Sequence, residues 1–341
     1  MRALILSLAL AAGAFAGSAA LAQDQTFDLK FSSWVPPSHG MHPAIKAWGE
    51  SMAKASNGTL KLGLFPSQQL GKAEDHYDMA RDGIAEFTYV SMGYQPGRLP
   101  LGESGSLPFL YSTGGNGSKA FDAFYRKYQQ AEMKDVKFCF AFIHDPATIY
   151  SKVPIKRPED VKGIKMRSAN TQTSELVTDL GGINVRVAAP EARAALESGV
   201  AEAIMFPWKS ILLFGIDKAV NHAIDFNLYT TTFAILMHQG TYDKMSAPQK
   251  KVIDEHCSNE WAFQVGKTWG DYEAAGRAEL QGKRGFVTYK PTPDDIKAWR
   301  DAGKGVHTRW ENQVKAKGLD PAKVLADLQD EIKKTDPWLG L

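Results

Sequence analysis

The sequence predicts an α/β protein of two lobes, with a long helix that spans both of them. The first observation behind this prediction is an alternation of short apolar strands and amphipathic helices that occurs in two successive series. The second is one helical run from residue 246 to about residue 282. The third is the length of 341 residues, which exceeds that of a typical single domain.

The first series begins where residues 27–33 alternate apolar and polar side chains, as a strand does. The next apolar residues, Ile45, Trp48 and Met52, step by three and four positions, which indicates a helix that begins after Ser38 and ends at Gly58. The same patterns continue along the chain. They predict strands at 59–65, 86–92 and 136–143, and helices at about 72–83 and 118–131.

The second series repeats the alternation on a new set of elements. They are strands 164–168, 184–188 and 202–206 and helices 171–180 and 190–199. We expect one lobe to comprise residues 23–145 plus about 235–275, and the other about 146–234 plus about 276–341. Ligands of open α/β sheets bind beyond the carboxyl ends of the strands, so the residues just after the strands are the candidate site.

The predicted long helix begins with a capping box. Ser246 and Gln249 have the spacing of that motif, and Pro248 suits the first turn. At about 1.5 Å per residue, some 35 residues reach about 50 Å, more than one small lobe. We therefore expect this helix to cross from one lobe to the other.

The N-terminus has the features of a cleaved signal peptide at residues 1–22. A basic start, Met1-Arg2, precedes an uncharged apolar stretch, and Ala20-Leu21-Ala22 fits the cleavage pattern. The alternative is a membrane anchor, but the stretch is short and rich in alanine and glycine. We expect an exported protein, secreted or periplasmic.

Composition and motifs argue against several classes of function. Lys plus Arg total 40 and Asp plus Glu total 38, and this balance does not indicate a nucleic-acid partner. The only cysteines, Cys139 and Cys257, are expected to be two separate buried thiols, although export leaves a disulfide as the alternative.

The sequence contains no recognisable enzyme or metal motif. The glycine-rich segment 114–119 lacks the Gly-Lys-Ser/Thr order of a phosphate loop and is interpreted as a flexible turn. His39 and His42 have no third ligand nearby and are assigned to a surface turn and the helix start. We therefore expect no catalytic residue, no metal and no cofactor, and the combination of export with two α/β lobes indicates a binding protein.

Four segments then resemble one known family. Residues 154–167, PIKRPEDVKGIKMR, resemble the signature of the solute receptors of TRAP transporters, the DctP-like periplasmic binding proteins. Residues 65–71 (FPSQQLG), 107–110 (LPFL) and 180–200 match further family motifs in the same order. The resemblance covers nearly the whole mature chain.

This resemblance implies a periplasmic binding protein fold, in which two lobes joined by a hinge and a spanning helix close on an organic anion. It also implies delivery of that anion to the membrane permease subunits of a TRAP transporter. Arg167 matches the family's signature arginine, which pairs with the substrate carboxylate; a planar guanidinium offers two parallel donors to such a group. The alternative for Arg167 is a surface ion pair.

The chain departs from the family pattern in two places. A second arginine found in many members is absent near Pro146, and Phe206 replaces a polar asparagine, with Trp208 beside it. These changes favour a monocarboxylate with an apolar, aromatic or cationic remainder, although Phe206 and Trp208 are equally interpretable as core. The candidate ligand contacts beside Arg167 are Trp208, Phe206, Tyr94, Trp34, Phe109, Phe233, Asn170 and Ser91.

Other functions stay open at this point. An ABC-type receptor would lack the spanning helix and the arginine signature. A sensory binding protein would pass its ligand to a regulator instead of a permease. An exported enzyme would need a site that no motif reveals.

Overall fold

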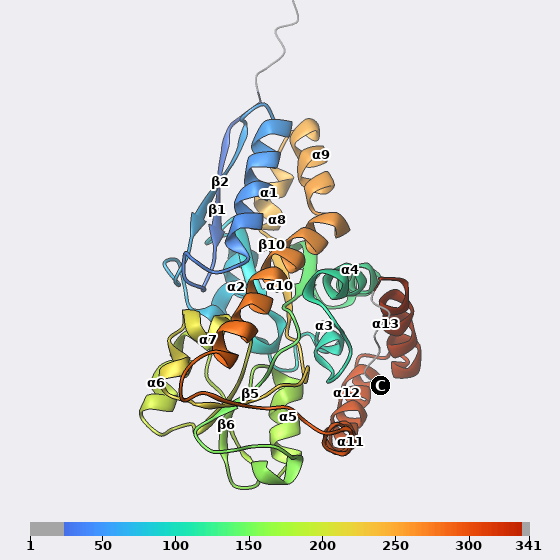
Figure 1. Cartoon of the computed structure of the whole chain (residues 1–341). Helices are drawn as coiled ribbons and strands as arrows, with labels where there is room; N and C mark the ends of the chain where they lie inside the picture. The colour runs from blue at the N-terminus through green and yellow to red at the C-terminus, as the bar shows by residue number, and fades with distance from the viewer. Residues whose placement is uncertain (1–23, 336–341) are drawn as a thin grey trace, which may run out of the picture.

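The computed structural model describes residues 24–335, and two sheets organise them (Figure 1). The first sheet has the order β2-β1-β3-β10-β4 and the second the order β11-β9-β5-β8-β6-β7. The strands are β1 (Phe27–Ser32), β2 (Leu60–Phe65), β3 (Phe87–Ser91), β4 (Lys137–Ile143), β5 (Thr148–Ser151), β6 (Lys165–Arg167), β7 (Ile183–Val185), β8 (Ala203–Phe206), β9 (His222–Ile224), β10 (Thr232–Met237) and β11 (Val287–Tyr289). This arrangement confirms the predicted α/β class; the predicted signal peptide lies outside the described residues.

Several helices pack on these sheets through an apolar face. The helices are α1 (His42–Ala55), α2 (His76–Asp82), α3 (Pro100–Glu103), α4 (Gly114–Tyr125), α5 (Thr171–Asp179), α6 (Ala192–Glu197), α7 (Ser210–Leu213), α8 (Gln239–Asp243), α9 (Ala247–His256), α10 (Asn259–Gln281), α11 (Pro293–Ala302), α12 (Lys304–Ala316) and α13 (Pro321–Thr335). Trp48 of α1, for example, packs edge-on against Phe87 and Phe140 of the first sheet. Helix α1 begins at His42 after Met41, which makes no side-chain cap, so the expected start after Ser38 is wrong.

The chain passes between the sheets three times. It leaves the first sheet after β4, returns through β10, and crosses again along α10 (Figure 1). Strand β10 is antiparallel to both β3 and β4, so its first residues lie beside the last residues of those strands. This geometry brings the carboxyl ends of β1, β3 and β4 and the start of β10 to one edge, facing the second sheet.

The prediction of a single helix from residue 246 to 282 is wrong, because this segment forms two helices. The predicted capping box of Ser246 and Gln249 starts α9, but the chain leaves helical geometry at Cys257 and resumes as α10 at Asn259. The carbonyl of His256, in the last turn of α9, accepts a hydrogen bond from Trp48 Nε1 at 2.9 Å. Helix α10 alone, 23 residues or about 35 Å, spans both lobes.

The two cysteines form a disulfide, so the expectation of separate thiols is also wrong. Cys139 lies in β4 and Cys257 follows α9, and their Cα atoms are 4.2 Å apart. Their 118-residue separation in sequence hides this proximity, which exists only because α9 ends against the edge strand of the first sheet.

The glycine-rich segment interpreted as a flexible turn is the first turn of α4. Helices α4 and α10 cross closely there, and glycine is needed on both sides. A Cβ on Gly114 would lie 3.0 Å from the carbonyl oxygen of Gly266, and one on Gly266 would lie 2.0 Å from Oγ of Ser118. The glycines therefore serve helix packing, which outweighs their low helix propensity.

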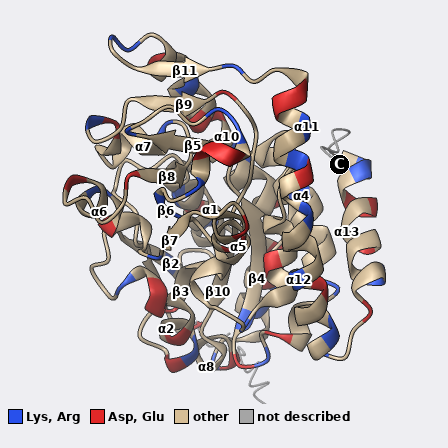
Figure 2. Ribbon diagram, turned by 90° about the horizontal axis from the view of Figure 1, so that it is seen from below, with Lys and Arg blue, Asp and Glu red and all other residues tan. Residues whose placement is uncertain are grey.

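The C-terminal helices α11, α12 and α13 lie along one side of the molecule (Figure 1). Trp310 of α12 is fully buried and donates from Nε1 to the carbonyl of Pro100 at 3.0 Å, while α13 packs on α4. Acidic and basic residues are interspersed along the outer helices (Figure 2). Within residues 24–335, no helix is both long and apolar enough to cross a membrane.

Candidate functional site

A cavity lies where the carboxyl ends of strands from the two sheets face each other. Trp34 and His39 follow β1, Tyr94 follows β3 and His144 follows β4, whereas Arg167 ends β6 in the other lobe. The residues that line it are Trp34, Val35, His39, Ser91, Tyr94, His144, Arg167, Ala169, Ala189, Phe206, Pro207, Ser210, Phe214, Tyr229, Thr231, Phe233 and Trp269. Its place agrees with the strand-end rule for open α/β sheets.

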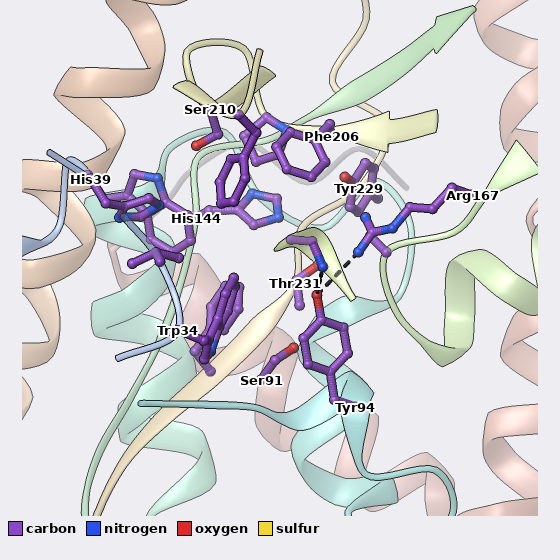
Figure 3. Close-up of a pocket in the computed structure, with 17 residues that line it drawn as sticks. Trp34, His39, Ser91, Tyr94, His144, Arg167, Phe206, Ser210, Tyr229 and Thr231 are labelled. Atoms are coloured by element: carbon purple, nitrogen blue, oxygen red, sulfur yellow. Dashed lines mark hydrogen bonds between the residues drawn. The ribbon is translucent and has the colours of Figure 1, made fainter. Parts of the chain in front are cut away.

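Arg167 is buried at one side of this cavity (Figure 3). Its Nε donates to the carbonyl of Val187 at 3.1 Å and its Nη1 to the carbonyl of Met205 at 3.2 Å. Among residues 24–335 it has no Asp or Glu within ion-pair distance. The backbone of the second lobe thus orients the guanidinium, while its charge has no anionic partner.

Tyr94 connects Arg167 to the first lobe. Its hydroxyl oxygen accepts hydrogen bonds from Arg167 Nη2 at 3.2 Å and from the backbone N–H of Ala189 at 2.9 Å (Figure 3). Burial raises the pKa of Tyr94, so the hydroxyl is protonated at neutral pH. Because both bonds are accepted by the oxygen, the hydroxyl hydrogen is free to donate into the cavity.

Aromatic side chains make most of the remaining wall. Trp34 stacks on Tyr89 with ring centroids 4.8 Å apart, and its Nε1 donates to the Tyr89 carbonyl at 3.1 Å. Phe233 of β10 contacts Trp269 of α10 at 5.2 Å between centroids. On the other lobe, Phe206 packs edge-on against Phe214 at 5.5 Å. These rings form a rigid apolar slot, because they hold one another in place.

Two hydroxyl groups in the wall are unsatisfied. Ser91 Oγ and Tyr229 Oη are buried, line the cavity, and have no hydrogen-bond partner among the described residues. Burial also raises the pKa of Tyr229, which therefore keeps its hydrogen. Buried polar groups are nearly always paired in folded proteins, so both hydroxyls are available to a bound molecule.

Helix α10 joins the cavity wall to the second lobe through Glu273. This buried carboxylate accepts hydrogen bonds from Trp269 Nε1 at 2.7 Å, from the backbone N–H of Ser210 at 3.0 Å, and from the Ser210 hydroxyl. Burial raises its pKa above the ordinary value. Glu273 thereby links Trp269 of α10 to Ser210 of the second lobe.

Six of the nine predicted ligand contacts line the cavity. They are Trp34, Ser91, Tyr94, Arg167, Phe206 and Phe233. Three lie elsewhere. Trp208 packs on Tyr150 at 5.5 Å between centroids, and the guanidinium carbon of Arg277 lies 5.3 Å from the Trp208 ring centroid.

The other two residues outside the cavity are Phe109 and Asn170. Phe109 packs on Phe226 at 5.5 Å. Asn170 caps α5 and donates from Nδ2 to Thr231 Oγ1 at 3.1 Å, so it supports a wall residue from behind. The binding roles of all nine residues stay predictions.

Sequence patterns missed several wall residues, chiefly His39, His144, Tyr229 and Trp269. His39 and His42 are both buried, so the expected surface turn is wrong. Trp269 of α10 covers His39 at 4.7 Å between ring centroids, and no local pattern reveals that crossing. Within residues 24–335, no group of three or more His, Cys, Asp or Glu side chains is placed to hold a metal ion.

A family model for bacterial extracellular solute-binding proteins, family 7 (DctP), matches residues 31–313. The chain belongs to this family. This membership confirms the resemblance seen in the sequence motifs, and the two-lobe fold is that of TRAP solute-binding proteins.

Solved structures and a curated relative of this family support the assignment. A TRAP solute-binding protein of Rhodoferax ferrireducens T118, in complex with copurified benzoate, is 25% identical with a TM-score of 0.86, over 91% of this chain and 98% of that one. A Bordetella bronchiseptica TRAP protein with bound (R)- and (S)-mandelate is 30% identical with a TM-score of 0.85, over 91% of this chain and 100% of that one. The C4-dicarboxylate-binding periplasmic protein DctP of Rhodobacter capsulatus is 20% identical over 93% of this chain and 94% of that protein.

Proposed function

We propose that this family 7 receptor captures a small aromatic monocarboxylate in the periplasm and delivers it to TRAP membrane permease subunits. The observation that carries the proposal is the Arg167 guanidinium, which is buried in the cavity without an acidic partner. A desolvated charge needs an opposite charge nearby, and a ligand carboxylate supplies it. Tyr94 donates its free hydroxyl hydrogen to the same carboxylate.

The charges around the cavity support one carboxylate rather than two. Arg167 is the only Lys or Arg among the described lining residues, and no Asp or Glu is among them. A second carboxylate on the ligand would therefore find no Lys or Arg in the cavity with which to form an ion pair. A cationic remainder would likewise have no carboxylate partner, so the aromatic class is preferred over the cationic one.

The wall chemistry supports an aromatic remainder. Trp34 and Phe233 of the first lobe and Phe206 of the second line the cavity with aromatic rings, and aromatic pairs gain from offset or edge-on contact. The relatives solved with benzoate and mandelate share the fold over nearly the whole chain. Periplasmic location and release to a permease rest on the predicted signal peptide and on family membership.

The test is a binding screen on the purified mature protein. We expect benzoate or phenylacetate to raise the melting temperature and to titrate at one site by calorimetry, while succinate, a dicarboxylate, has little effect. A ligand that binds only the folded state stabilises it by mass action. Preference for succinate over every aromatic acid would overturn the proposal. Chromatography of the incubated ligand should return it unchanged, because we propose binding without catalysis.

A further inference from the structure

Two histidines line the cavity at positions that the proposed carboxylate anchor does not use. His39 follows β1 and His144 follows β4, and both are buried. In the view of Figure 3, His39 and Arg167 lie on opposite sides of the cavity, with His144 between them. Both imidazoles contact the same indole, that of Trp269, at 4.7 Å and 5.6 Å between ring centroids.

Both rings are neutral at periplasmic pH. Burial lowers the pKa of His144 to about 4 and holds the pKa of His39 well below its ordinary value. The described residues that line the cavity include no carboxylate that would favour imidazolium. The two histidines therefore add hydrogen-bonding groups to the cavity without adding positive charge.

The backbone contacts of the two rings fix opposite tautomers. His144 Nδ1 lies 2.6 Å from the carbonyl oxygen of Asp145, which only accepts, so Nδ1 carries the hydrogen and Nε2 carries a lone pair. His39 Nδ1 instead accepts from the backbone N–H of Met41 at 3.3 Å, so its hydrogen is on Nε2. Neither Nε2 atom has a hydrogen-bond partner among residues 24–335. The cavity thus offers one free acceptor and one free donor away from Arg167.

We propose that His144 and His39 select a ligand whose ring carries a hydroxyl group away from its carboxylate. This inference rests on the proposed function, since it assumes that Arg167 holds the carboxylate. A hydroxyl both donates and accepts, so it donates to His144 Nε2 and accepts from the Nε2–H of His39. An unsubstituted ring leaves both nitrogens buried and unpaired, and a site built for a hydroxyl discriminates against ligands that lack it.

The test compares matched acids by calorimetry on the mature protein: benzoate, 3-hydroxybenzoate, 4-hydroxybenzoate and their two methyl ethers. We expect one hydroxybenzoate to bind about 10- to 100-fold more tightly than benzoate, and its methyl ether to lose that gain, because an ether cannot donate. In the His144→Phe variant, the hydroxybenzoate should bind at most about threefold more tightly than benzoate, while benzoate itself still binds. His39→Phe should reduce the preference in the same direction.

Two further variants keep the test decisive. His144→Gln retains a polar acceptor and should keep part of the preference, which covers the case in which His144→Phe does not fold. His76→Phe is the matched control, since His76 is buried with its pKa lowered to about 4 but bonds to Ser32 and Lys72 outside the cavity. It should leave the preference unchanged.

The outcomes separate this inference from the proposed function. Equal binding of benzoate and both hydroxybenzoates by the parent protein overturns the inference alone, as does a preference that survives His144→Phe. Failure of every aromatic acid to bind overturns both proposals.

Discussion

The two lobes contribute different chemistry to one cavity. The second lobe supplies the cation: Arg167 ends a three-residue strand and is held by backbone carbonyls of Val187 and Met205. The first lobe supplies Trp34, His39 and His144, which follow its strands. In the proposed function the second lobe therefore provides the charge that holds the carboxylate, and these rings of the first lobe contact the remainder of the ligand.

The largest effect on affinity is expected at the cation. Arg167→Ala should weaken benzoate binding by about 30-fold to several thousand-fold, because loss of one partner in a desolvated charged pair costs about 2–5 kcal/mol. Arg167→Lys should recover only part of this, since an ammonium cannot make two parallel bonds. Calorimetry measures both, with melting temperature as the control for folding. Affinity of Arg167→Ala within twofold of the parent would place the anchor elsewhere.

Substitutions of two tryptophans distinguish a residue of the cavity wall from a residue of the second lobe's core. Trp208→Ala should lower the free energy of unfolding by about 3–5 kcal/mol, as emptied aromatic sites do, and leave affinity within about threefold, because Trp208 packs on Tyr150 outside the cavity. Trp34→Ala should instead weaken benzoate binding by about tenfold or more, since it removes a wall of the slot. Denaturant unfolding and calorimetry on the same two variants test the contrast. The reverse pattern would assign Trp208 to the ligand wall.

The disulfide affects the first lobe without touching the cavity. Replacing Cys139 and Cys257 together by alanine should lower the free energy of unfolding by about 2–5 kcal/mol, because the crosslink closes a loop of 118 residues. Neither cysteine lines the cavity, so the dissociation constant should stay within about twofold. An affinity change much larger than that would show that loss of the disulfide alters the part of the cavity wall that the first lobe supplies.

The smallest free-energy change is expected at the contact between the lobes. Tyr94→Phe removes the oxygen that accepts from Arg167 and Ala189, and it should weaken binding by about 2- to 12-fold, the equivalent of about 0.5–1.5 kcal/mol for a hydrogen bond. A loss as large as that of Arg167→Ala would mean that Tyr94, and not the guanidinium, is the main anchor.

The fold was predictable wherever local patterns decide it. Strands β1 to β4 and β6 to β8 begin and end within about three residues of the predicted segments, because alternating or continuous apolar runs mark them. Three of the failures come from tertiary contacts. The Cys139–Cys257 disulfide and the bond from Trp48 to the His256 carbonyl both lie where α9 ends, and the α4 glycines are helical because α10 crosses them.

The candidate site was predictable in part for the same reason. Arg167, Tyr94 and Ser91 follow or end strands, so position along the chain was sufficient to place them at the cavity. Phe206 and Trp208 looked alike in sequence, but the chain leaves β8 at Pro207, so only Phe206 faces the cavity. His39 joins the wall because Trp269 arrives from a helix some 230 residues later in the chain.

The most direct test of the central claim is the affinity of benzoate and benzamide for the parent protein and for Arg167→Ala. The amide has nearly the same shape as the acid but no charge, so the comparison isolates the ion pair. We predict that the parent prefers benzoate by about 30-fold or more and that this preference falls to near unity in Arg167→Ala. A preference for benzoate that survives unchanged in the folded variant would contradict the account.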